Sequence, residues 1–97
     1  MLAALLLAST LAAQSLTITP GNGLTTGETA TIEYTNSGMA GQSVTITVSG
    51  GFPVSETIEI KIQLDADGKG SAKWVVREWA AARFNAPGVH EVTKAIR

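Results

Sequence analysis

Apolar and polar residues alternate with a two-residue period through nearly all of the chain after residue 14. Because successive side chains of a β-strand point to opposite faces, this period predicts half-buried strands. The strand at 57–64 has the most regular pattern, whereas 89–96 is less regular because Lys94 shares a face with Val92 and Ile96. The expected strands cover residues 15–19, 29–35, 42–49, 57–64, 71–77 and 89–96.

Turn-forming residues separate these segments at intervals of about eight to twelve residues. Because Asp-Gly suits turn positions with positive φ, Asp65–Gly70 is expected to be a hairpin turn. Helix is credible only at 78–82, where the sequence EWAAA allows a short helix. Six or seven short strands separated by such turns predict an all-β fold, either a β-sandwich or a small barrel.

The first thirteen residues differ in character from the rest of the chain. Residues 2–13 form a predominantly apolar run ending in small residues, which is the pattern of a signal peptide cleaved after Ala12 or Ala13. The run is shorter than the roughly 20 residues that a membrane-spanning helix needs. No Lys or Arg follows Met1, so an N-terminal core helix is the alternative. We expect residues 1–13 to direct export and residues 14–97 to form one domain that is secreted, periplasmic or at the cell surface.

Composition narrows the classes of protein further. Of the 97 residues, 44% are hydrophobic and 15% are charged, and the net charge is −1. The low charge argues against a disordered or coiled-coil chain, and the near-neutral balance gives no general attraction to nucleic acid. With no Cys, disulfides, thiolate zinc sites and cysteine nucleophiles are excluded.

Charge is unevenly distributed along the chain. Residues 1–60 carry four acids and no Lys or Arg, whereas residues 61–97 carry all seven basic residues and four acids. If this split survives on the folded surface, complementary faces favour head-to-tail self-association.

Four stretches of the sequence resemble bacterial immunoglobulin-like domains of secreted and cell-surface proteins. They are SLTITP, TTGETATIEYTNSGMAGQSVTITVSG, LDADGKGSAKWVV and APGVHEVTKAI, and together they extend over most of residues 15–96. The resemblance implies an immunoglobulin-like antiparallel β-sandwich in an extracellular setting, with no catalytic residues. The Cys…Trp…Cys pattern of antibody domains is absent, so no disulfide joins the sheets.

Residues that could carry catalysis or bind a metal are few. His90 is the single histidine and no nucleophile signature accompanies it, while Glu56 and Glu59 are not expected to share a strand face. We therefore expect no enzymatic activity and no cofactor. Asp65 and Asp67 resemble the start of a calcium loop, but Lys69 occupies the position of the third ligand. The favoured interpretation is a turn with solvated carboxylates, and a weak calcium site is the alternative.

Two groups of residues are candidates for a binding surface. Trp79 and Phe84 lie in a connecting segment, where they either close one end of the core or form a ligand-binding patch for a polysaccharide or protein. Three Thr-x-Thr pairs present hydroxyls on strand faces, where Thr is also simply a favoured exposed residue. The pairs are Thr17/Thr19, Thr29/Thr31 and Thr45/Thr47.

These features predict a non-enzymatic binding or structural module that acts outside the cytoplasm. Its partner is expected to be a protein or polysaccharide at the cell surface, or a second copy of the chain, with no nucleic acid and no membrane span. The alternative function is a subunit of an extracellular assembly or filament, in which the first or last strand pairs with a neighbour. A small hydrolase is the third and least favoured hypothesis.

Overall fold

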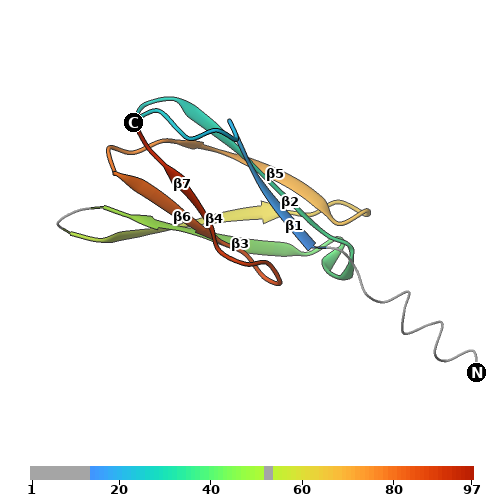
Figure 1. Ribbon diagram of the computed structural model, residues 1–97. Coiled ribbons are helices and arrows are strands. Elements are labelled where there is room, and N and C mark those ends of the chain that lie inside the picture. Colours follow the sequence, from blue (N-terminus) through green and yellow to red (C-terminus); the bar gives the residue numbers. More distant parts are fainter. Residues whose placement is uncertain (1–13, 52–53) are drawn as a thin grey trace, which may run out of the picture.

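The computed structural model describes residues 14–51 and 54–97, so the predicted signal peptide lies outside the described residues (Figure 1). A single 3₁₀ turn, η1 (Ser37–Met39), lies between the second and third strands. The strands form two sheets, one of three strands and one of four, which confirms the predicted antiparallel β-sandwich. Within the described ranges the strands are β1 (Gln14–Thr19), β2 (Thr29–Asn36), β3 (Ser43–Gly50), β4 (Glu56–Gln63), β5 (Lys69–Val75), β6 (Ala81–Asn85) and β7 (Val92–Ala95).

The chain passes repeatedly from one sheet to the other. One sheet has the order β1-β2-β5 and the other has the order β4-β3-β6-β7, and all neighbours are antiparallel. The chain therefore crosses between the sheets after β2, after β4 and after β5. In antibody constant domains the fourth strand belongs to the same sheet as the fifth, whereas here β4 pairs with β3. This pairing puts β4 at the edge of the wider sheet.

The short helix predicted at 78–82 does not form. Residues 76–80 are an irregular connection, and β6 begins at Ala81. The run of alanines suits a helix, but Ala82 and Phe84 are both fully buried and alternate with exposed or half-buried neighbours. Burial with a period of two decides the conformation here, because tertiary packing outweighs the small differences in helix propensity.

The Asp65–Gly70 segment makes a tight turn, but it is not a hairpin. The Asp65 amide donates to the Lys69 carbonyl, and the Gly68 amide donates to the Asp65 carbonyl. However, β4 pairs with β3 and β5 pairs with β2, so the turn carries the chain from one sheet to the other. Gly68 has φ +81°, and a Cβ atom there would lie 2.5 Å from the Asn36 carbonyl oxygen. The turn therefore packs directly against the start of η1, which fixes where β5 begins.

The final strand, β7, is shorter than predicted. The position of Lys94 in it is explained by the apolar stem and the charged end of its side chain. Lys94 is half-buried on the same face as Val92 and Ile96. Its ammonium group donates to the Gly21 carbonyl at 2.9 Å. The aliphatic part of a lysine can lie against apolar surface while the charged end reaches a polar partner. The pairing of β6 with β7 is regular at this position, with Ala82 opposite Lys94.

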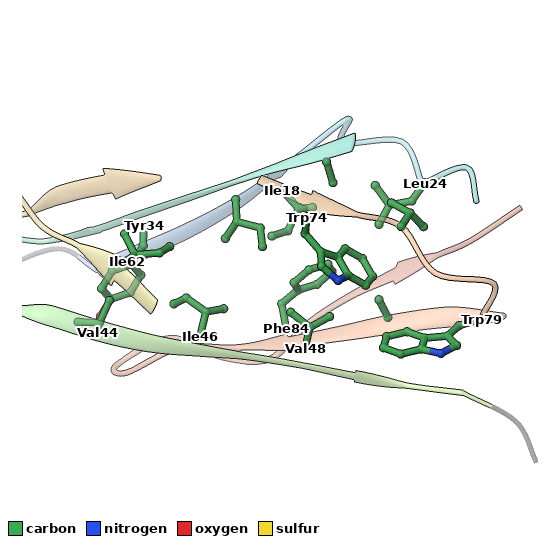
Figure 2. Close-up of a cluster of buried hydrophobic side chains, with 14 of the residues drawn as sticks. Ile18, Leu24, Tyr34, Val44, Ile46, Val48, Ile62, Trp74, Trp79 and Phe84 are labelled. Carbon is green, nitrogen blue, oxygen red and sulfur yellow. The ribbon is translucent and has the colours of Figure 1, made fainter. Parts of the chain in front are cut away.

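The core lies between the inner faces of the two sheets (Figure 2). Ile32 and Ile46 come from facing sheets and are completely buried, and Trp74 is 7% exposed. The Trp74 ring stacks edge-on against Phe84, with the ring centroids 5.7 Å apart. Aromatic and branched aliphatic packing thus joins the sheets of this cysteine-free chain. The buried apolar residues are Ile18, Leu24, Ala30, Ile32, Tyr34, Val44, Ile46, Val48, Ile62, Leu64, Trp74, Val76, Trp79, Ala82 and Phe84.

The segment after β1 closes one side of the sandwich. Leu24 forms a parallel bridge with Ile96, and its amide donates to the Ala95 carbonyl at 2.9 Å. The Thr26 amide donates to the Arg97 carbonyl at the same distance. The segment between β1 and β2 therefore pairs with the end of β7 in the other sheet before the chain returns to the three-stranded sheet as β2.

A buried polar network lies at the C-terminal end of β2. Asn36 is the one buried polar side chain among the described residues that is not aromatic. Its Nδ2 donates to the Tyr34 hydroxyl, and its Oδ1 accepts from the Gly38 amide at 3.1 Å. The Tyr34 hydroxyl in turn donates to the Pro87 carbonyl. The network links β2, η1 and the β6–β7 connection.

Candidate functional site

The outer face of the β1-β2-β5 sheet is covered by polar side chains that the strand register brings into rows. Thr17 on β1 faces Glu33 on β2, and Glu33 faces Ser71 on β5. In the next row, Ser15 faces Thr35, which faces Lys69. Because residues with the same parity point to the same side of a sheet, these side chains share the solvent-exposed face.

A shallow hollow opens over these two rows. Two of its lining residues, Asp65 and Gly70, come from the connection between the sheets and from the start of β5. Hydroxyl, carboxylate and ammonium groups therefore meet within one concave surface. The lining residues are Ser15, Thr17, Glu33, Tyr34, Thr35, Asp65, Lys69, Gly70 and Ser71.

Most polar side chains of the hollow have no partner in the described part of the chain. The hydroxyls of Ser15, Thr17 and Ser71 and the carboxylate of Glu33 make no hydrogen bond or ion pair with another described residue. These four residues come from three strands, β1, β2 and β5, and all four are exposed. Each hydroxyl can donate once and accept twice, and a carboxylate accepts several hydrogen bonds. These groups can therefore form hydrogen bonds with the hydroxyl groups of a ligand in place of water.

Asp65 at the rim is occupied by its own turn. Its Oδ1 accepts from the amide of Asp67 at 2.8 Å and from the amide of Lys69 at 3.0 Å. These backbone hydrogen bonds, led by the one from Lys69, lower the pKa of Asp65 below its ordinary value of 3.8. The carboxylate thus stabilises the turn. Among the described residues no three His, Cys, Asp or Glu side chains gather in a way that could hold a metal ion.

The three Thr-x-Thr pairs do not form one array. Thr17/Thr19 and Thr29/Thr31 lie on the outer face of the three-stranded sheet, where Thr19 faces Thr31. Thr45/Thr47 lies on β3, in the other sheet. Since the two sheets pack through their inner faces, the third pair points away from the first two. Two of the pairs therefore share the outer face of one sheet, and the third lies on the outer face of the other sheet.

Trp79 and Phe84, the sequence-based candidates for a binding patch, lie in the core. Trp79 is 9% exposed and Phe84 is fully buried. The Trp79 ring lies 5.6 Å from the Trp74 ring between centroids, and a Cβ atom on Gly50 would come within 2.5 Å of it. This placement supports the first of the two roles, closing one end of the sandwich, because a stacking platform needs an exposed ring face.

Glu56 accepts hydrogen bonds from both Arg77 and Trp79, which the sequence pattern does not predict. Its carboxylate accepts from the Arg77 guanidinium, with both oxygens at 3.1 Å, and Oε1 also accepts from the Trp79 indole N–H at 3.2 Å. The guanidinium lies 5.9 Å from the Trp79 ring centroid. In the sequence, Arg77 and Trp79 stand two positions apart, but they follow Glu56 by 21 and 23 residues. Only the fold brings the three side chains together.

The remaining candidate acid and base residues are dispersed. Glu59 is exposed on the outer face of β4, where it faces Thr47 of β3. His90 is exposed in the connection between β6 and β7. Neither makes an ion pair with another described residue.

The four sheet edges differ in what they expose. β1, β4 and β5 each pair with one strand, whereas β7 has its C-terminal end covered by the segment from Leu24 to Thr26. Of the two strands considered for pairing with a neighbour, the first therefore has one edge that no described strand pairs with, and the last is partly covered. β1 carries no charged residue, β4 carries three, and β5 carries Lys69 and Lys73.

No protein-family model matches the sequence, and no curated protein matches it. Within the described ranges, no helix has the length and apolar character required to cross a membrane.

Proposed function

We propose that this chain is a non-enzymatic module of the bacterial immunoglobulin-like kind, that it acts outside the cytoplasm, and that it binds a polysaccharide at the cell surface. The observation that carries the proposal is the hollow on the β1-β2-β5 sheet, where hydroxyl groups flank Glu33 on both sides. The apolar run at residues 2–13 supports an extracytoplasmic setting.

The chemistry of the hollow matches a carbohydrate better than an apolar ligand. The hydroxyls of sugars donate and accept hydrogen bonds, and so do those of Ser15, Thr17 and Ser71. The hollow is open, and its aromatic lining residue, Tyr34, has its ring buried in the core. Hydrogen bonds of this kind contribute about 0.5–1.5 kcal/mol each, so a few of them give a dissociation constant in the millimolar range.

The proposal is tested by binding to cell-envelope polysaccharides and to an array of defined oligosaccharides. Thr17→Val removes a hydroxyl from the hollow with little change in shape, and Ser71→Ala removes a second one. The double variant is expected to lose about fivefold or more in affinity while its melting temperature stays close to that of the wild type, since both side chains are exposed. Isothermal titration calorimetry and differential scanning fluorimetry measure the two quantities.

The matched control is Thr45→Val, which removes a hydroxyl from the outer face of the other sheet. It is expected to bind like the wild type. Absence of wild-type binding to every polysaccharide tested would refute the proposal, and so would an equal loss in the control.

A further inference from the structure

The edge of β4 has a sequence that is complementary to itself. Along its outer face Glu59 and Lys61 are exposed neighbours of opposite charge, and neither forms an ion pair with another described residue. Along its inner face Ile58 and Ile60 are only half-buried, although they point the same way as the fully buried Ile62. One side of β4 pairs with β3, and on the other side no strand of the described ranges pairs with it, so that side is a sheet edge.

We propose that a second copy of this chain pairs with β4 along this edge, antiparallel and about a two-fold axis at Ile60. In this register Glu59 of each copy faces Lys61 of the other, so two cross-strand ion pairs form. Ile60 faces Ile60, and Ile58 faces Ile62, so that the half-exposed side chains gain apolar neighbours. Facing side chains of opposite charge and facing β-branched residues are the pairs that stabilise antiparallel strands.

Neighbouring registers are disfavoured by the same two charges. A shift of the axis to Glu59 sets two glutamates opposite each other, and a shift to Lys61 sets two lysines opposite each other. Since facing like charges destabilise a strand pair, the charges select the register centred on Ile60.

The other edges lack this specification. On β5 the corresponding pairing about Ser71 sets Lys69 against Lys73, which are like charges. On β1 no charge fixes a register, and the end of β7 is already paired with the segment that begins at Leu24. Charges on edge strands commonly serve to prevent pairing, but here their order makes them attractive between two copies. The β4 contact does not depend on whether the hollow binds a polysaccharide, because the hollow lies on the other sheet.

The test is the mass in solution, measured by sedimentation equilibrium from about 10 µM to about 1 mM, the range in which small interfaces dissociate. The wild type is expected to approach twice the mass of its monomer as concentration rises. Lys61→Glu turns both ion pairs into facing carboxylates and is expected to raise the dissociation constant of the dimer about tenfold or more. The charge swap Glu59→Lys with Lys61→Glu re-forms both ion pairs and is expected to restore the dimer.

The control is Lys73→Glu, which makes the same change of charge on the β5 edge and is expected to leave the dimer unchanged. A wild type that stays monomeric up to about 1 mM overturns the proposal. The proposal is equally overturned if Lys61→Glu and Lys73→Glu weaken the dimer alike, or if the charge swap fails to restore it. All three positions are exposed, so a melting curve of each variant is expected to match the wild type and to confirm that it is folded.

Discussion

A single residue, Asn36, joins three parts of the molecule. Its side chain donates to the Tyr34 hydroxyl and accepts from the Gly38 amide, and its backbone amide donates to the Gly68 carbonyl. At 5% exposure, the side chain has little access to water that could replace these partners. A buried group that keeps both of its partners is stabilising, whereas removing it leaves the partners unsatisfied.

The first prediction concerns this residue. Asn36→Ala leaves the Gly38 amide without its acceptor and the Tyr34 hydroxyl without its donor. We expect the free energy of unfolding to fall by about 1–3 kcal/mol, as measured by urea denaturation. Asn22→Ala is the matched control, because Asn22 is exposed in the turn after β1 and its loss should change stability by no more than about 0.5 kcal/mol. Equal losses in the two variants would show that the network contributes nothing.

At the scale of elements, the packing of the β4–β5 turn against η1 decides where the chain changes sheets. Gly68 has positive φ, and a Cβ atom there would come within 2.5 Å of the Asn36 carbonyl oxygen and within 2.6 Å of the Ser37 Cα. Because the obstacle is backbone, it cannot move aside as a flexible side chain could. The close approach, rather than the turn conformation alone, requires glycine here.

The second prediction separates these two requirements. Gly27 also has positive φ, at +90°, but nothing lies within 4 Å of a Cβ atom placed on it. Gly27→Ala is therefore expected to cost about 1–2 kcal/mol of unfolding free energy, from backbone strain alone. Gly68→Ala should cost more, because it adds the clash with η1. If both variants lose the same stability in chemical denaturation, the turn does not depend on close contact with η1.

The elements also show which parts of the fold the sequence could predict. The predicted strand 57–64 corresponds to β4 (Glu56–Gln63), because the alternation of Ile with polar residues is itself the physical cause of the strand. The alternation does not say which strand is the neighbour, so the turn at Asp65 was predicted as a hairpin although β4 and β5 belong to different sheets. At 78–82, local helix propensity was outweighed by burial of Ala82.

The candidate site was less predictable than the strands. Thr17, Glu33 and Ser71 are far apart in the sequence and meet only because β2 lies between β1 and β5. The sequence pattern contains the Thr pairs but does not indicate that the third pair lies on the other sheet. Trp79 is a candidate in the sequence because it is aromatic and lies in a connecting segment. Its burial depends on the space left by Gly50 and on the acceptor supplied by Glu56.

At the scale of the whole molecule, the two proposed surfaces are compatible with each other. The hollow lies on the outer face of the β1-β2-β5 sheet, while the β4 edge belongs to the other sheet. A dimer formed through β4 would therefore leave one hollow open on each copy. Two weak sites joined in one particle bind a long repetitive polymer more tightly than either site alone, because the second binding step becomes intramolecular.

The last prediction follows from this arrangement. A long polysaccharide should bind the wild type at least about tenfold more tightly than it binds Lys61→Glu, whereas a short oligosaccharide that fills one hollow should bind both equally. Biolayer interferometry on immobilised polysaccharide, with the protein above and below the dissociation constant of the dimer, measures the difference. Lys73→Glu serves as the control for charge, since it lies outside the β4 edge. A gain for the long polymer that persists in Lys61→Glu would contradict avidity through β4, because the hollow of that variant is intact.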